Sequence, residues 1–170
     1  MKTKLLFVVT EDWYFVSHRL ALGIAAVNLG YEVVVATRVR GHGDIILNSG
    51  IRVIPFELSR RSGYPFKEIW KLFRLYRNES PQIIHHVALK PAIYGSIASW
   101  LAHSNATVNA ISGLGWIFTS SRWIVRMLRP TIRWIMGRAL SRAGGITIVQ
   151  NTQDRDLLNY AGVDEKQIRL

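Results

Sequence analysis

The chain has 170 residues, of which 49% are hydrophobic and 11% aromatic, which excludes a disordered protein and fits one domain with a sizeable core. Its formal net charge of +11 favours attraction to phosphates, on nucleic acid or at an anionic membrane surface, although a basic face with no specific partner has the same composition. The absence of cysteine excludes disulfides, thiolate metal sites and a cysteine nucleophile, and it fits a reducing cytoplasm.

The N-terminal segment predicts a strand, a helix and a second strand. Residues 4–10 form a short apolar run, which is typical of a strand buried on both faces. Ser17 is predicted to cap a helix over residues 18–27, which Gly30 ends, and residues 31–37 predict another buried strand. Such a unit is right-handed with parallel strands. The first apolar run is too short for a secretory signal, and no run reaches the length of a spanning helix, so we expect a soluble or peripheral protein.

The same alternation is predicted for the rest of the chain. Helices are expected over residues 42–49, 65–78, 92–102, 121–143 and 152–160, and strands over residues 50–55, 82–86, 107–111 and 146–150. Pro91 is expected at a helix start and Pro130 at a kink or break. The predicted fold class is α/β: a single Rossmann-like domain over residues 1–162, with a doubly wound parallel sheet. Residues 163–170 are expected to begin a linker or a new strand. Functional loops should follow the carboxyl ends of the strands.

The loop after the first strand carries Glu11, Asp12, Ser17 and His18. Without a GxGxxG pattern, dinucleotide binding by this loop is not expected. The two carboxylates are candidates for binding sugar hydroxyls or for acting as a base, but they also suit the positive end of a helix. His18 is a candidate catalyst, or else a packed helix residue. Asp12 and His18 are therefore the catalytic candidates at this loop.

Two further loops carry candidate binding residues. His85 and His86 end a strand, so their side chains point to opposite faces and do not chelate one metal together; we expect one in the cleft and one in the core. Lys90 precedes a helix start, where an anion can bind. Gly113 and Gly115 follow another strand and allow either close backbone approach to a ligand or a tight turn. In a fourth loop, which carries Gln150 and Asn151, Thr152 is expected to cap the last helix and Asp154 to lie in its first turn, a structural role.

The long basic helix is the other candidate surface. Four arginines spaced four, three and four residues apart form one stripe beside Trp123, and residues 122–143 contain no acidic residue. Arginine beside tryptophan is typical of an interfacial helix on anionic lipid, while a core-packing helix with a solvated cationic face is the alternative. The predicted membrane-contacting residues are Arg122, Trp123, Arg126, Arg129 and Arg133. Neither a helix-turn-helix nor an RNA-binding pattern is present, so no nucleic-acid partner is expected.

Taken together, four motifs resemble the family 4 glycosyltransferases of the GT-B fold from bacterial surface-polysaccharide pathways. They are residues 10–20 (TEDWYFVSHRL), 89–96 (LKPAIYGS) and 113–118 (GLGWIF), and Gln150-Asn151 followed by Asp154. The resemblance runs over the whole chain but covers only the N-terminal, acceptor-side domain of that family. The donor-side domain, with its pair of glutamates, is expected to be absent from these residues.

The resemblance implies a function and its partners. Relatives transfer a sugar from a nucleotide-sugar donor to an acceptor, often a lipid-linked sugar, with retention of configuration. They usually use no metal, and the nucleotide-sugar is a substrate rather than a cofactor. For such an acceptor domain, the substrate-binding residues predicted from their position at the strand ends are Glu11, Asp12, Ser17, His18, His86, Lys90, Gly113 and Gly115. A histidine that some relatives place after the strand over residues 107–111 is replaced here by Ser112-Gly113.

Two hypotheses follow from the residues and the resemblance. The first is an acceptor-binding domain of a glycosyltransferase at the inner face of the cell membrane, inactive alone. The alternative is a non-catalytic module that binds anionic lipid, or a partner chain that carries the donor domain of a split enzyme. An isolated fragment is a third possibility, because the chain ends where a new strand begins.

Overall fold

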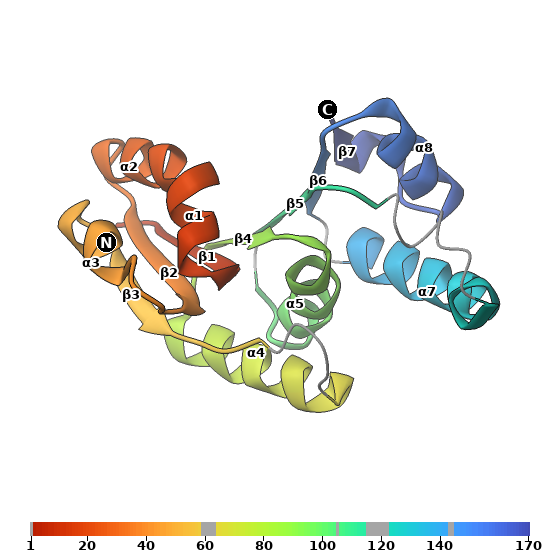
Figure 1. Cartoon of the computed structure of the whole chain (residues 1–170), viewed down its shortest axis with the longest axis horizontal. Coiled ribbons are helices and arrows are strands. Elements are labelled where there is room, and N and C mark those ends of the chain that lie inside the picture. The colour runs from red at the N-terminus through yellow and green to blue at the C-terminus, as the bar shows by residue number, and fades with distance from the viewer. Residues whose placement is uncertain (1, 59–63, 105, 115–122, 143–144) are drawn as a thin grey trace.

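The computed structural model describes residues 2–58, 64–104, 106–114, 123–142 and 145–170. Among the described residues, strands and helices alternate, with two consecutive helices after the first strand (Figure 1). The elements are β1 (Lys4–Glu11), α1 (Asp12–His18), α2 (Leu20–Asn28), β2 (Glu32–Arg38), α3 (Gly43–Asn48), β3 (Arg52–Pro55), α4 (Pro65–Glu79), β4 (Ile83–Val87), α5 (Leu89–Leu101), β5 (Ala106–Ile111), α7 (Trp123–Arg142), β6 (Ile146–Val149), α8 (Thr152–Tyr160), a 3-10 turn (Glu165–Gln167) and β7 (Ile168–Arg169).

All the described strands form one parallel sheet in the order β3-β2-β1-β4-β5-β6-β7. The chain builds outward from β1 to β3 and then returns to add β4 on the other side of β1. The strand order therefore reverses between β1 and β4, and this is the point where open α/β sheets bind ligands. The predicted α/β class and the doubly wound parallel sheet are confirmed.

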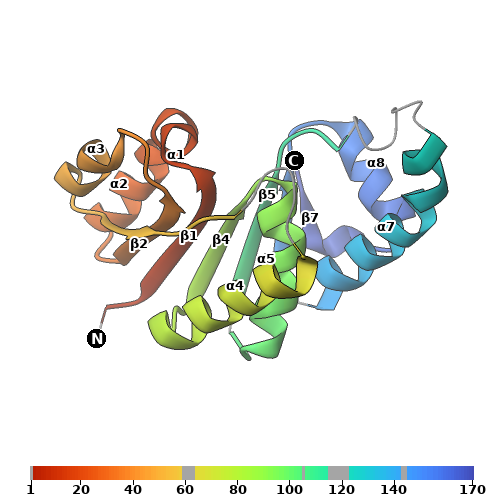
Figure 2. The same ribbon diagram turned by 60° about the horizontal axis from the view of Figure 1, so that its bottom comes forward.

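Helices cover both faces of the first half of the sheet. Alternate residues of the strands point to opposite faces, so Phe7 and Val35 pack with Phe15 under α1–α3, while Leu6 and Val34 pack with Leu72 under α4 and α5. In Figure 2 the helices α4, α5 and α7 run along the same side of the sheet. Side chains of α7 and α8 pack together with Ile111, Val149 and Ile168.

The opposite face of β6 has no such cover among the described residues. Val108 pairs with Ile146 and Ala110 with Ile148, on the face of Phe7 and His85. Ile146 and Ile148 are exposed there, whereas Val149 on the other face is buried. Among the described residues, this face of β6 therefore leaves Ile146 and Ile148 open to solvent.

Several local expectations from the sequence are corrected. The first loop is helical from Asp12, and the Ser17 hydroxyl donates back to the Trp13 carbonyl (2.9 Å) instead of capping a helix. The cap of α8 is Asn151, whose side chain accepts from the Asp154 N–H (2.7 Å) in place of Thr152.

Two larger segments complete the comparison. Of the kink or break expected at Pro130, the break is absent, because helix α7 runs through this residue. Residues 168–169, where a linker or a new strand is expected, form β7 and pair with Thr147 and Ile148 as the edge strand of the same sheet.

Candidate functional site

A pocket of about 420 Å³ lies at the carboxyl ends of β1, β4 and β5, where the strand order reverses. Its walls come from three segments: Thr10 of β1, residues 88–94 at the start of α5, and Ser112–Gly113 after β5. The three segments are distant in sequence, and the parallel sheet brings them together because its carboxyl ends share one edge. This is the place and size expected of a small-molecule site.

Lys90 supplies the positive charge of this pocket. It lies in the first turn of α5, where backbone N–H groups and the helix dipole favour an anion. Its ammonium nitrogen is 5.3 Å from the centroid of the Tyr94 ring, one turn further along the same helix, in a cation–π contact. The fold therefore places Lys90 in the pocket wall, at the carboxyl edge of the sheet.

The backbone at the base of the pocket is strained at Ala88. This residue has φ 80° and ψ 162°, a conformation that is essentially restricted to glycine and costs about 1–3 kcal/mol in other residues. Hydrogen bonds on both sides hold it there: its N–H donates to the Ala110 carbonyl (2.9 Å), and its carbonyl accepts from the Ala92 N–H (3.0 Å). Strain of this kind concentrates at binding sites.

The loop after β5 is held in place by a hydrogen bond to α8. Asp154, buried at the start of α8, accepts hydrogen bonds from the Leu114 N–H (3.1 Å) and from the Asn151 side-chain amide (3.0 Å). Gly113 has φ 77°, so the turn itself requires glycine, and a Cβ added there would meet nothing within 4 Å. The structure thus supports the tight-turn role of Gly113 and leaves open space beside it. Gly115 lies outside the described residues.

Helix α1 reaches the rim of the pocket through Tyr14. The Tyr14 hydroxyl is 3.3 Å from the Ser112 hydroxyl, which joins the first loop to the end of β5. The ring of His18 stacks on Tyr14 at 4.3 Å between centroids, and its Nδ1 is 2.7 Å from the Ser17 hydroxyl. His18 and Ser17 are exposed and lie next to the pocket wall rather than in it.

The two acidic candidates point away from the pocket. Asp12 is 0% exposed, and its carboxylate accepts from the N–H groups of Trp13 (2.8 Å), Arg40 (2.6 Å) and His42 (2.9 Å). Burial raises the pKa of Asp12, but these hydrogen bonds outweigh burial and hold it below its usual value. Glu11 pairs with the Arg38 guanidinium (3.3 Å). This geometry favours the structural alternative for both carboxylates.

Both histidines of β4 are buried, so neither lies in an open cleft. His86 is held between the Tyr76 hydroxyl (2.8 Å) and the Asn109 side-chain oxygen (2.7 Å). Because the Asn109 oxygen only accepts, His86 donates from Nδ1 and accepts the tyrosine proton at Nε2, which defines a neutral ring. Burial lowers the pKa of His86 to about 4. A Cβ on Gly95 would clash with His86, so α5 needs glycine to pass over this ring.

Most of the predicted arginine stripe cannot be compared with the structure. Arg122, like the side chains of Trp123, Arg126 and Arg129, lies outside the described part of the chain. Arg133 is described: its guanidinium is 4.2 Å from the centroid of the Tyr160 ring, so this arginine packs on α8. No helix within the described ranges is long and apolar enough to cross a membrane.

Of the residues that line the pocket, the sequence predicted only Lys90 and Gly113. It missed Thr10, Ala88, Tyr94 and Ser112 among others, and Tyr14 at the rim. Thr10 ends the first apolar run, and Tyr94 lies one turn after Lys90, so strand ends and helical spacing already indicated both. The Tyr14–Ser112 contact joins residues 98 apart in sequence. No pattern in the sequence indicates the positive φ of Ala88, because alanine is ordinarily a helix former.

Comparison with known proteins gives a family and a fold. The sequence model of a family described as glycosyl transferase 4-like matches residues 4–151. No curated protein sequence matches the chain.

The chain is also similar to solved structures of low sequence identity. A putative UDP-N-acetylglucosamine 2-epimerase from Listeria monocytogenes has 12% identity and a TM-score of 0.64, with 99% of this chain and 44% of that chain covered. A glycosyltransferase from Rickettsia africae ESF-5 has 13% identity and a TM-score of 0.63, with coverage of 99% and 42%. Anabaena HepE in complex with UDP and glucose has 16% identity and a TM-score of 0.64, with coverage of 98% and 43%. The chain therefore spans less than half the length of these neighbours.

Proposed function

Because the chain belongs to the glycosyl transferase 4-like family, we propose that it forms the acceptor-binding domain of a retaining, nucleotide-sugar-dependent glycosyltransferase. The acceptor is a lipid-linked or polysaccharide sugar at a membrane surface. The observation that carries this proposal is the pocket at the point where the strand order reverses, with Lys90 in its wall. The nucleotide-sugar is bound mainly by a second domain, so this domain alone is inactive.

The proposed roles follow from the position of each residue. Lys90 and the N-terminus of α5 attract the acceptor's phosphate groups. Ser112, fixed by Tyr14, offers a hydroxyl to the acceptor sugar, and the open space at Gly113 lets the backbone approach it. His18 orients an acceptor hydroxyl from the rim. Asp12 and His86 do not touch the acceptor. They stabilise the surrounding structure, Asp12 through the loop after β2 and His86 through its contacts with α4 and β5.

The test of this proposal is titration of the purified chain with inorganic diphosphate by isothermal calorimetry. Lys90→Gln is expected to weaken binding about tenfold, since it removes one close charge pair. Lys67→Gln is the matched control, because Lys67 is exposed on α4 and does not line the pocket. Equal affinity of the Lys90→Gln variant and the wild type would exclude Lys90 from the site.

The proposed location is the inner face of the cell membrane, with the arginine stripe of residues 122–133 against anionic lipid. The net charge of +11 supports this placement. The measurement is co-sedimentation with anionic liposomes at low and high salt. Binding should fall with salt and disappear when Arg122, Arg126, Arg129 and Arg133 are changed to glutamine. Binding that persists in this variant would exclude the stripe.

A second candidate function is a non-catalytic module that binds a partner chain. The exposed face of β6, with Ile146 and Ile148, supports this candidate because an apolar sheet face is normally covered. A partner that supplies the donor domain would bury it. The test is the mass of the purified chain in solution, followed by Ile148→Asp. Association that the substitution abolishes would favour this candidate.

A further inference from the structure

A second, larger cavity of about 550 Å³ lies between α4, α5 and α7. Its walls are almost wholly apolar, with Phe66 and Ile69 from α4, Ile97 and Trp100 from α5, and Trp134 and Ile135 from α7. The three helices lie on the same side of the sheet (Figure 2). We call this cavity the apolar groove.

The apolar groove exposes aromatic side chains that a folded domain ordinarily buries. Phe66 is 86% exposed and Trp134 is 62% exposed, although both line the cavity. The hydroxyl of Ser96 in its wall is buried and donates to the Asn109 side-chain oxygen (3.2 Å), so this hydroxyl already has a partner. An apolar ligand without polar groups suits such a wall, and contiguous apolar surface of this kind marks a binding site.

The apolar groove adjoins the pocket at the strand ends. Ile93 and Tyr94 line both cavities, and Tyr94 holds the Lys90 ammonium 5.3 Å from its ring centroid. Arg138 adds a second cation to the apolar groove, 5.7 Å from the Trp134 ring centroid. No acidic residue of the described chain lines either cavity. A cationic pocket that continues into an apolar groove is complementary to an amphiphile with an anionic head and a hydrocarbon chain.

We propose that the apolar groove binds the hydrocarbon chain of an amphiphilic acceptor whose phosphate head lies at Lys90. This inference rests on the proposed function and extends it, because it assigns a subsite to the acceptor's lipid. The occupant is one chain in a concave cavity, rather than the flat surface of a bilayer. The position of Lys90 supports this choice, since its ammonium nitrogen lies 5.3 Å from the ring centroid of Tyr94, which lines both cavities.

The test compares three ligands of one head group by isothermal calorimetry, without detergent and below their aggregation concentrations. They are inorganic diphosphate, dimethylallyl diphosphate and geranylgeranyl diphosphate. Each buried methylene adds about fourfold to affinity, so the long chain should bind at least about tenfold more tightly than the short one. Phe66→Ser should remove most of that gain and leave the affinity for inorganic diphosphate unchanged.

Trp70→Ser is the matched control for this variant. Trp70 lies one turn from Phe66 on the same helix and is 59% exposed, but it does not line the apolar groove. Its substitution should leave all three affinities unchanged. Equal affinity for the short and long chains, with binding that still depends on Lys90, would overturn the inference and leave the proposed function standing. Absence of binding by all three ligands would overturn both.

A third outcome assigns the apolar groove to the membrane itself. If Phe66→Ser weakens co-sedimentation with liposomes and leaves the chain-length dependence intact, Phe66 contacts the bilayer and the subsite is not where we place it. Circular dichroism of each variant verifies that the fold is retained. Phe66 is well suited to this test because so exposed a side chain contributes little to the core.

Discussion

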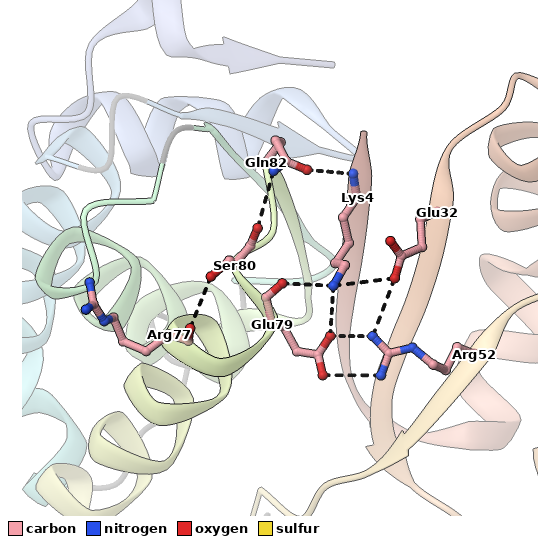
Figure 3. A network of polar contacts seen from close by, with 7 residues as sticks. All are labelled: Lys4, Glu32, Arg52, Arg77, Glu79, Ser80 and Gln82. Atoms are coloured by element: carbon pink, nitrogen blue, oxygen red, sulfur yellow. Dashed lines mark hydrogen bonds and ion pairs between the residues drawn. The ribbon is translucent and has the colours of Figure 1, made fainter. Parts of the chain in front are cut away.

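The two edges of the sheet are built in opposite ways. At the amino ends of the strands, Lys4, Glu32, Arg52 and Glu79 form a network of ion pairs that joins β1, β2 and β3 to the end of α4 (Figure 3). At the carboxyl ends, the described chain has a pocket, a strained backbone at Ala88 and a single cation in the pocket wall. At the amino edge, ion pairs link the strands to α4, whereas at the carboxyl edge the strand ends surround a pocket.

The difference shows how this domain divides stability from binding. In the amino-edge network each charge has a partner of opposite sign, so the network has little capacity to bind an external ion. The hydrogen bond from Arg52, aided by Lys4, lowers the pKa of Glu79 although burial opposes it. At the other edge, the strain at Ala88 is a cost to the folded state, and Lys90 gives the pocket wall a positive charge that would attract an anion. Substitutions should therefore separate the two edges.

The largest expected effect is a loss of stability in acid that originates at the carboxyl end of β4. Burial lowers the pKa values of both His85 and His86 from 6.5 to about 4. Between these values the unfolded chain binds more protons than the folded chain, so stability falls as the pH drops from about 6.5 to about 4. Each histidine accounts for about 3 kcal/mol over this range.

Urea unfolding measured at steps of pH checks this expectation. The variant His86→Gln should lose a large part of the dependence between pH 6.5 and 4. The amino-edge carboxylates act only at lower pH, because the pKa of Glu79 is already lowered below its ordinary value. Stability that stays constant down to pH 5 would show that the histidines are not buried as described.

The next effect, about 3 kcal/mol, concerns Asp12. Asp12→Ala would leave the N–H groups of Arg40 and His42 without their acceptor, and hydrogen bonds to a charged group are worth about 1.5–3 kcal/mol. Asp44→Ala, an exposed aspartate in the first turn of α3, should cost less than about 1 kcal/mol. Thermal unfolding measures both. A loss of diphosphate binding with unchanged stability would instead return Asp12 to the binding site.

These carboxylates also show which features can be predicted from the sequence and which cannot. Apolar runs and turn residues predicted the alternating elements and the loops at the strand ends, because both depend on local chemistry. The direction of Asp12 depends on the loop after β2, whose backbone N–H groups donate to it from 28 and 30 residues away. The direction of Glu11 depends on Arg38 at the end of β2. The burial of His86 likewise required Tyr76, Asn109 and Gly95 from three other elements. Long-range partners of this kind leave no local pattern.

A smaller effect is expected from relief of the strain at Ala88. Glycine adopts φ 80° at little steric cost, so Ala88→Gly should stabilise the domain by about 1 kcal/mol after the entropy cost of glycine is subtracted. The midpoint of urea unfolding measures this gain. Ala98→Gly, in the middle of α5, is the control and should destabilise the domain. Destabilisation by both substitutions would show that Ala88 is not strained.

The smallest expected effect is at the amino edge. Glu79→Gln removes the partner of Lys4 and Arg52, yet Arg52 is partly exposed and solvent screens its charge, so the cost should be about 1 kcal/mol or less. Diphosphate binding should remain unchanged, because the substitution lies at the edge opposite the pocket. Glu57→Gln, whose carboxylate is largely exposed, should have almost no effect on stability. If Glu79→Gln weakened diphosphate binding as strongly as Lys90→Gln does, the two edges would be coupled, and the division between a stabilising and a binding edge would fail.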